Sequence, residues 1–376
     1  AKTMADEHES DTEDAHVERS VKSYLDSFLG LRDPNQPPES RSRTGSFFDR
    51  VVCCGSSRSL YCKVCCSLLV PDHSLPIPIS LQKGNDDTDS EVNNNSAGRP
   101  LRLPFNLHII LDDRRGSATG LHAMTLLNGT DGKCADENYY LGRNQDDPKI
   151  RSNDVDNTSS NPSFDAVDLG SVKLIDLAND DEIPRYQQCA DSTFLLFPSP
   201  GESVPLESVA SDVQTLVVLD CKWTKSSIWR KNKDLSVLPK VHLSSPPPKS
   251  FYWRWHNAGK GMISTIEAIF YAASEVSQIK HQHLLESGQI SAFDYENYLT
   301  DQKNLIHLLW LFGHQRAATF KSAQNEGTAA PCSDEGKEMQ RVLRKQKGTW
   351  RQLRHKEDER RLNERRLQEE KKEPSV

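Results

Sequence analysis

The chain contains few apolar residues for its length, and they form no long run. Of its 376 residues only 35% are hydrophobic, and its mean hydropathy is −0.68. Much of the chain therefore cannot belong to a packed core, and we expect one globular domain diluted by disordered tails and insertions. No apolar stretch approaches the roughly 20 residues of a membrane helix, so we expect no membrane partner.

The start of the chain lacks the basic charge of a targeting presequence. Residues 1–14 are acidic, so we expect neither a secretory nor a mitochondrial signal there. The net charge of −7 argues only weakly against nucleic-acid binding, because residues 337–373 hold fourteen Lys or Arg against eight Asp or Glu. This segment predicts a charged helix that is either a solvated tail or a tail for RNA binding or nuclear import. We expect the nucleus or the cytoplasm, with the nucleus favoured.

The chain has nine cysteines, and several of them cluster near the N-terminus. An odd number favours thiols or metal ligands over a disulfide framework. Cys62 and Cys65 form a C-x-x-C pair, and Cys53 and Cys54 lie a short loop upstream. Four thiolates in this range suit a tetrahedral structural zinc site. Adjacent cysteines do not chelate as a C-x-x-C pair does, so buried or reactive free thiols are the alternative.

Predicted strands alternate with predicted helices along the middle of the chain. We expect strands at 105–111, 193–197, 215–219 and 238–243, and helices at 119–127, 204–213, 264–277 and 304–320. This alternation predicts an α/β fold with a mostly parallel sheet flanked by helices.

Composition divides the chain into three parts. Residues 1–45 are predicted to be a disordered acidic N-terminus that holds one short helix near 21–31. Residues 50–325 form the predicted central domain, which begins with the cysteine cluster at 53–66 and contains an Asn/Asp-rich insertion at 128–168. Residues 335–376 are the charged helical tail.

An acidic residue closes the predicted strand at 215–219. Asp220 follows this apolar run directly, and Trp223 comes three residues later. Ligands of open α/β sheets bind at the carboxyl ends of the strands, so Asp220 is a candidate base or electrostatic anchor and Trp223 is a candidate for stacking on a nucleobase. The structural alternatives are a helix N-cap for Asp220 and core packing for Trp223.

A second polar cluster opens the predicted helix at 264–277. Ser264-x-x-Glu267 is a capping-box pattern, in which each side chain bonds the other residue's backbone N–H. The N-terminus of a helix is also suited to binding a carboxylate or phosphate. The structural and the functional interpretation coexist here.

Two further features have both functional and structural explanations. Residues 253–261 are basic, aromatic and glycine-containing, which is typical of an RNA-contacting loop but also of packing before a turn. The candidate RNA contacts in this loop are Arg254, His256 and Lys260. His122 stands alone in a predicted helix, where a structural role competes with a functional one.

These motifs resemble those of the DTW-domain family. The family's strand-end Asp-x-Thr-Trp motif is similar to Asp220-Cys221-Lys222-Trp223, and its second signature is similar to Ser264-Thr265-Ile266-Glu267-Ala268. Other similar segments follow in the family's order: the early cysteines with Arg58 and Tyr61-Cys62, Leu121-His122-Ala123, Leu196-Phe197-Pro198-x-Pro200, and Trp253-Arg254. The resemblance spans residues 50–320 without the insertion. It departs at Lys222, where the family has Thr, and at the adjacent first cysteine pair.

The resemblance implies a tRNA-uridine aminocarboxypropyltransferase and a fold related to the knotted SPOUT methyltransferases. Such an enzyme transfers the 3-amino-3-carboxypropyl group of S-adenosylmethionine to N3 of a uridine in tRNA and releases 5′-methylthioadenosine. The implied site residues are Asp220 and Trp223 for catalysis, Pro198, His122, Ser264, Thr265 and Glu267 for the cofactor, Lys222, Arg254, His256 and Lys260 for RNA, and Cys53, Cys54, Cys62 and Cys65 for zinc.

The chemistry of this reaction fits the motifs. Uridine N3 carries a proton and is a poor nucleophile at neutral pH, so a carboxylate such as Asp220 can accept or orient that proton. The helix start at Ser264 and Thr265 suits the methionyl carboxylate, and Glu267 suits the amino group or the adenosine hydroxyls.

Two other functions fit the same residues. An RNA methyltransferase of the same broad fold would use the same cofactor but release S-adenosylhomocysteine. A non-catalytic, zinc-containing RNA-binding module would keep the fold, and Lys222 would then mark the loss of catalysis.

Overall fold

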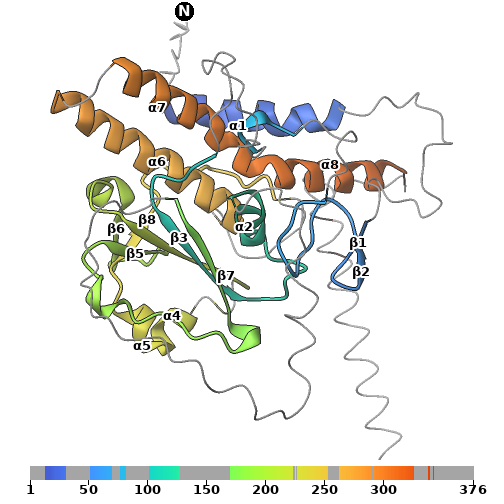
Figure 1. Cartoon of the computed structure of the whole chain (residues 1–376), viewed down its shortest axis with the longest axis horizontal. Helices are drawn as coiled ribbons and strands as arrows, with labels where there is room; N and C mark the ends of the chain where they lie inside the picture. The colour runs from blue at the N-terminus through green and yellow to red at the C-terminus, as the bar shows by residue number, and fades with distance from the viewer. Residues whose placement is uncertain are drawn as a thin grey trace, which may run out of the picture. The chain divides into compact units, whose positions relative to one another are not determined.

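The computed structural model describes residues 13–30, 51–69, 77–81, 101–127, 170–222, 225, 227–252, 262–288 and 292–325, with Glu338 and Val342 (Figure 1). The chain divides into two units, the first of residues 1–250 and 260–314 and the second of residues 251–259 and 315–376. The sheet, the cysteine cluster and every described candidate site residue belong to the first unit.

The first unit contains a six-stranded sheet in which all neighbouring strands run parallel. The strand order is β4-β3-β7-β5-β8-β6, and the bounds are β3 (Asn106–Asp112), β4 (Val172–Asp176), β5 (Thr193–Leu196), β6 (Ser203–Pro205), β7 (Thr215–Cys221) and β8 (Lys240–His242). A separate antiparallel hairpin consists of β1 (Val51–Cys53) and β2 (Ser56–Arg58). The predicted α/β class with a mostly parallel sheet is confirmed, and the knotted connection stays a prediction.

Helices lie on both faces of the sheet: α2 (Gly120–Leu127) and α6 (Thr265–Glu286) on one, and α4 (Ile228–Lys231) and α5 (Lys233–Ser236) on the other (Figure 1). The other described helices are α1 (Glu13–Gly30), α7 (Ala292–Leu305) and α8 (Trp310–Asn325). Short 3-10 turns complete the described elements: η2 (Ile79–Leu81), η3 (Leu177–Asn179), η4 (Tyr186–Gln188), η5 (Leu206–Val209) and η7 (Ile306–Leu309).

Successive strand residues point to opposite faces of the sheet, and this alternation places the site. Ile110 of β3 and Val217 of β7 face the apolar cluster that contains Trp229 of α4. Asp220 stands three residues after Val217 and therefore points to the other face, where α2 and α6 lie in Figure 1. The acid thus belongs to the helix-covered side that carries the starts of α2 and α6.

The N-terminal helix is longer than its sequence pattern predicts. It begins at Glu13 rather than near residue 21, and Val21, Leu25 and Phe28 are buried. A Cβ on Gly313 would lie 2.7 Å from two ring carbons of Phe28, so glycine is needed for this close packing. The helix predicted near residues 21–31 is therefore present and extends to Glu13, and the rest of residues 1–45 lies outside the described residues.

Other elements also differ from the sequence prediction. The predicted helix at 204–213 is wrong, because its first residues form the short strand β6 and the rest includes the single 3-10 turn η5. Pro205 lacks an N–H and ends that strand. Strand β4 was not predicted, and its sequence, Val-Lys-Leu-Ile-Asp, alternates between apolar and polar residues only as far as Leu174. The insertion at 128–168 and nearly all of the tail at 335–376 lie outside the described residues. Within the described residues, no helix has the length and apolarity needed to cross a membrane.

Candidate functional site

The candidate site lies where β3 and β7 end beside each other. Leu111 pairs with Asp220 and Asp112 pairs with Cys221 in the parallel register, so both strands end at the same edge of the sheet. This is the edge at which open α/β sheets bind ligands. The chain leaves β3 towards α2, and α6 begins next to the same point, because Thr265 and Gly120 both contact Asp220.

The carboxylate of Asp220 joins the starts of two helices to the end of β7. The backbone N–H of Gly120 donates to Oδ2 at 2.6 Å, and the hydroxyl of Thr265 donates to Oδ1 at 3.1 Å. The N–H of Ile266 donates to Oγ1 of Thr119 at 3.3 Å, which links the two helix starts directly. Asp220 is only 6% exposed, so these bonds lie in a largely dry environment.

Gly120 allows the close approach between α2 and Asp220. A Cβ at this position would lie 2.7 Å from Oδ2 of Asp220 and 3.0 Å from Cγ2 of Ile109. Any larger residue would push the helix start away from the carboxylate. Sequence analysis did not single out this glycine, although a glycine at the start of a helix that follows a strand is a usable signal.

The capping box at the start of α6 is present as predicted. Ser264 is the N-cap, and Glu267 reaches back to its backbone N–H at 2.8 Å. Glu267 is fully buried, and the same oxygen, Oε2, also accepts from the hydroxyls of Ser264 at 2.6 Å and Ser250 at 2.7 Å. Glu267 thus fixes the geometry of the α6 start and of the segment that carries Ser250.

Burial controls the protonation of Asp220. It raises the pKa of the carboxyl to about 6, and the charge of Asp113 raises it further, while hydrogen bonds from Gly120 and Thr265 act in the opposite direction. A carboxyl with this pKa is mostly ionised at neutral pH and is more basic than an exposed aspartate. It is therefore suited to accept a proton near physiological pH.

The two predicted cofactor residues His122 and Pro198 differ in burial. His122 is completely buried in α2, and neither ring nitrogen has a hydrogen-bond partner among the described residues. Burial lowers the pKa of His122 to about 3, so its ring is neutral. Its ring instead packs edge-on against Tyr61, with centroids 5.3 Å apart. Pro198 is exposed directly after β5.

Lys222 occupies the position of the family's threonine and points outward. Its side chain is 59% exposed, and its Nζ lies 4.0 Å from Oδ1 of Asp113. The hydroxyl that bonds Asp220 is supplied by Thr265, so Lys222 does not fill the space beside the carboxylate. Trp223, Arg254, His256 and Lys260 lie outside the described residues.

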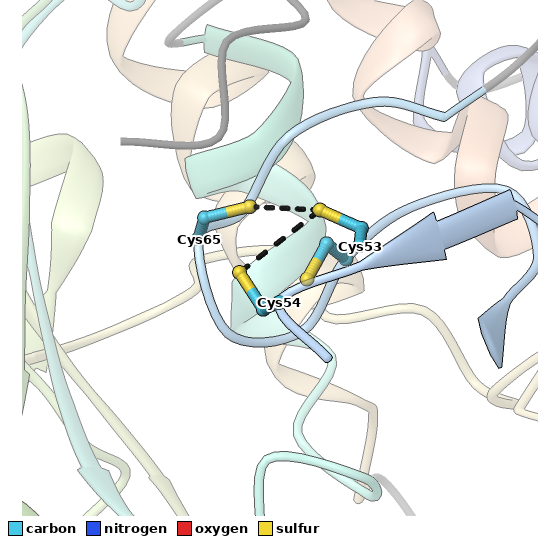
Figure 2. A group of neighbouring side chains, drawn as sticks. Cys53, Cys54 and Cys65 are labelled. Carbon is cyan, nitrogen blue, oxygen red and sulfur yellow. Dashed lines mark hydrogen bonds between the residues drawn. The ribbon is translucent and has the colours of Figure 1, made fainter. Parts of the chain in front are cut away.

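The four predicted zinc ligands converge. The sulfur atoms of Cys53, Cys54, Cys62 and Cys65 all lie within 4.8 Å of one another. Figure 2 shows the Sγ atoms of Cys53, Cys54 and Cys65 turned towards each other, with Cys53 3.6 Å from Cys65 and 4.0 Å from Cys54. A tetrahedral ion with Zn–S distances of about 2.3 Å separates its sulfur ligands by about 3.8 Å. The cysteines therefore fit a zinc ion.

A tight hairpin turn explains how two adjacent cysteines reach one point. Cys54 and Gly55 form the two-residue turn between β1 and β2, and both have positive φ values, 47° and 68°. A two-residue turn with this backbone favours Asn or Gly at both positions, so a cysteine at the first one is unusual. With this turn, the Sγ atom of Cys54 lies 4.0 Å from the Sγ atom of Cys53.

We predict that replacing Asp220 with asparagine changes the pH dependence of stability. The folded pKa of about 6 exceeds the usual 3.8, so Asp220 favours the folded state below pH 3.8 and this contribution is lost as the pH rises through 6. The shift corresponds to about 3 kcal/mol. Asparagine keeps an oxygen for Gly120 and can donate to Thr265. Urea denaturation from pH 4 to 8 should therefore show the Asp220→Asn variant gaining stability relative to the original chain as the pH rises. A pH-independent difference would contradict the raised pKa.

Comparison with known proteins identifies part of the chain. Residues 171–315 match the family model of the DTW domain. Among solved structures, the chain is similar to the SAM-dependent rRNA:acp-transferase Tsr3 from Vulcanisaeta distributa, at 12% identity and a TM-score of 0.25, over 64% of this chain and 96% of that chain. A likeness this weak carries no argument of its own, and no curated protein matches the chain. The matched residues include the Asp220 and Ser264 motifs, so residues 171–315 are similar to the DTW domain, the family that these motifs resemble.

Proposed function

We propose that the chain is an RNA-modifying transferase that moves the 3-amino-3-carboxypropyl group of S-adenosylmethionine to N3 of a uridine in tRNA. The observation that carries this proposal is the buried Asp220 carboxylate, which lies within the residues similar to the DTW domain and binds the starts of α2 and α6. A basic carboxylate beside two helix N-termini combines a proton acceptor with a region that attracts an anionic group.

The bonds and protons of the reaction balance with Asp220 as the acceptor. N3 of the uridine attacks the methionyl carbon next to sulfur, the carbon–sulfur bond breaks, and its electron pair stays on sulfur. The products are the N3-alkylated uridine and neutral 5′-methylthioadenosine. The proton of N3 passes to Asp220, whose pKa of about 6 makes it basic enough to accept a proton and acidic enough to return it to water.

The remaining candidate residues position the two substrates. The start of α6 at Ser264 and Thr265 suits the methionyl carboxylate, and Glu267 holds that start in place through its capping bonds. Pro198 and His122 complete the cofactor side by family resemblance. Selecting one of the three carbons on sulfur is a matter of orientation, which rigid helix starts can supply.

Exposed cations near the site suit an RNA backbone. Lys222 and Lys225 are 59% and 53% exposed, and they approach Asp113, directly after β3, and Asp112, its last residue. We assign Lys222 to RNA phosphate contact, together with Arg254, His256 and Lys260 of the basic segment 253–261. Trp223 is assigned to the target nucleobase.

The transfer products test this function directly. The purified chain, S-adenosylmethionine and unmodified tRNA should yield 5′-methylthioadenosine and 3-(3-amino-3-carboxypropyl)uridine, both measured by mass spectrometry. Asp220→Asn, which keeps the bonds to Gly120 and Thr265, should lower the rate by about 100-fold or more while the chain still binds the cofactor. Release of S-adenosylhomocysteine would indicate a methyltransferase, and absence of cofactor binding to the original chain would indicate a non-catalytic module. An Asp220→Asn variant with the original rate would exclude Asp220 as the base.

The hydroxyl of Thr265 should set the acidic limit of the reaction. It donates to the Asp220 carboxylate and so lowers the pKa of that carboxyl. Replacing it in Thr265→Val removes this donor, and the pKa should rise further. The pH at which kcat/KM falls on the acidic side should therefore move from about 6 to a higher value. An unchanged acidic limb would mean that Asp220 is not the titrating group.

We also propose that Cys53, Cys54, Cys62 and Cys65 bind one structural zinc ion. Metal analysis of the purified chain should find about one zinc per chain. Cys65→Ser should lose the metal, whereas Cys66→Ser should keep it, because Cys66 is adjacent but lies outside the converging set. Full zinc content in Cys65→Ser would contradict the assignment.

A further inference from the structure

The cysteine loop, residues 62–65, is hydrogen-bonded to the β3–α2 connection, residues 113–119, which leads into the candidate site. Arg115 lies between β3 and α2, and its Nη1 donates to the backbone carbonyls of Lys63 at 3.0 Å and Val64 at 2.8 Å. These two residues are the spacer of the Cys62-x-x-Cys65 pair. The same guanidinium also donates through Nε to Asp176 at 2.7 Å. Arg115 therefore connects the cysteine loop to the end of strand β4.

Two further contacts connect the same segments. The Nζ of Lys63 donates to the carbonyl of Gly116 at 3.0 Å, so each loop donates to the backbone of the other. Tyr61, which precedes Cys62, packs edge-on against the buried ring of His122 in α2. The cysteine loop is thus attached both to the β3–α2 connection and to α2 itself.

The β3–α2 connection ends at Gly120, and the candidate site depends on this residue. Only four residues separate Arg115 from Gly120, whose N–H binds the Asp220 carboxylate. Thr119, the residue before it, accepts from the N–H of Ile266 in α6. A displacement of the β3–α2 connection would therefore alter both bonds that hold the helix starts together.

We propose that Arg115 is a positioning residue that couples metal binding at the four cysteines to cofactor binding at the Asp220 site. The inference rests on the proposed function for the cofactor side only. Bound zinc would hold the Cys62–Cys65 loop in one conformation. The backbone carbonyls of Lys63 and Val64 in that loop then hold the Arg115 guanidinium in place. The guanidinium in turn holds the β3–α2 connection, which ends at Gly120. Loss of the metal loosens the same connection.

Charge and geometry both favour Arg115 for this role. Four thiolates around one Zn²⁺ carry a formal net charge of −2, and Arg115 and Lys63 bring two positive charges to that loop. The Arg115 side chain is 23% exposed and Asp176 is 3% exposed, so their ion pair is poorly screened. A guanidinium can bond two carbonyls and a carboxylate in one plane, which a lysine cannot do. Residues outside the direct ligands commonly change metal affinity by about 10–100-fold.

Hydrogen–deuterium exchange of the full chain tests the coupling without any cofactor. Exchange is measured by mass spectrometry over residues 113–122, with zinc bound and after chelation under reducing conditions. The variants are Arg115→Leu, which removes the guanidinium, and Arg115→Lys, which keeps the positive charge beside Asp176. Arg114→Leu is the matched control, because Arg114 is the exposed neighbour and its side chain has no hydrogen bond or ion pair among the described residues.

The coupling predicts a specific pattern of exchange. Chelation should speed exchange across residues 113–122 in the original chain and in Arg114→Leu by about tenfold. Both Arg115 variants should exchange fast even with zinc bound and respond little to chelation. They should also bind zinc about tenfold more weakly in competition with a chromophoric chelator. If chelation leaves the original chain unchanged, or if both Arg115 variants behave like Arg114→Leu, the coupling is wrong. If Arg115→Leu does not fold, Arg115→Lys decides.

Calorimetry with S-adenosylmethionine separates this inference from the proposed function. The zinc-loaded original chain should bind the cofactor at least fivefold more tightly than the chelated chain, and Arg115→Lys should lose most of that difference. Equal affinity with and without zinc overturns the coupling and leaves the transferase proposal intact. If neither form binds the cofactor, the transferase proposal fails, and the exchange pattern alone decides whether the loops are coupled.

Discussion

The buried carboxylate of Asp220 is the interaction on which the rest of the site depends. It lies one residue before the end of the central strand β7 and accepts hydrogen bonds from α2 and α6, two helices that begin about 100 residues before it and 45 residues after it. Gly120 permits this contact because it has no Cβ, and Glu267 holds the start of α6 through its capping bonds. The cost of burying the carboxylate appears as a pKa raised to about 6, which is also what makes it a useful base.

Local patterns predicted the parts of the fold whose cause is local. The continuous apolar runs of β3 and β7 predicted buried parallel strands, and Ser264-x-x-Glu267 predicted the capping box at the start of α6. The competing N-cap explanation for Asp220 does not describe its observed bonds, because its partners Gly120 and Thr265 are distant in sequence. The helix predicted at 204–213 failed because a strand of only three residues leaves almost no periodic signal.

The contacts that join distant segments could not be predicted from the sequence. Arg115, Lys63 and Gly120 stand in unremarkable polar or small-residue contexts, and their importance comes from carbonyls and carboxylates that the topology brings to them. The adjacent pair Cys53-Cys54 looked unsuited to chelation, yet a tight turn with positive φ at Cys54 brings both sulfurs into the cluster. Lys222 departs from the family's threonine, and its exposed side chain is directed towards Asp113.

A crystal structure of the chain with S-adenosylmethionine would show whether Asp220 and the two helix starts form the cofactor site. We expect the cofactor to lie at the ends of β3 and β7, with its methionyl carboxylate within hydrogen-bond distance of the α6 start at Thr265 and with the carbon beside sulfur facing Asp220. The bonds from Gly120 and Thr265 to Asp220 should remain in place. A cofactor bound away from this edge of the sheet, or an Asp220 that rotates out of its bonds to α2 and α6 when the cofactor binds, would exclude Asp220 as the base of this site.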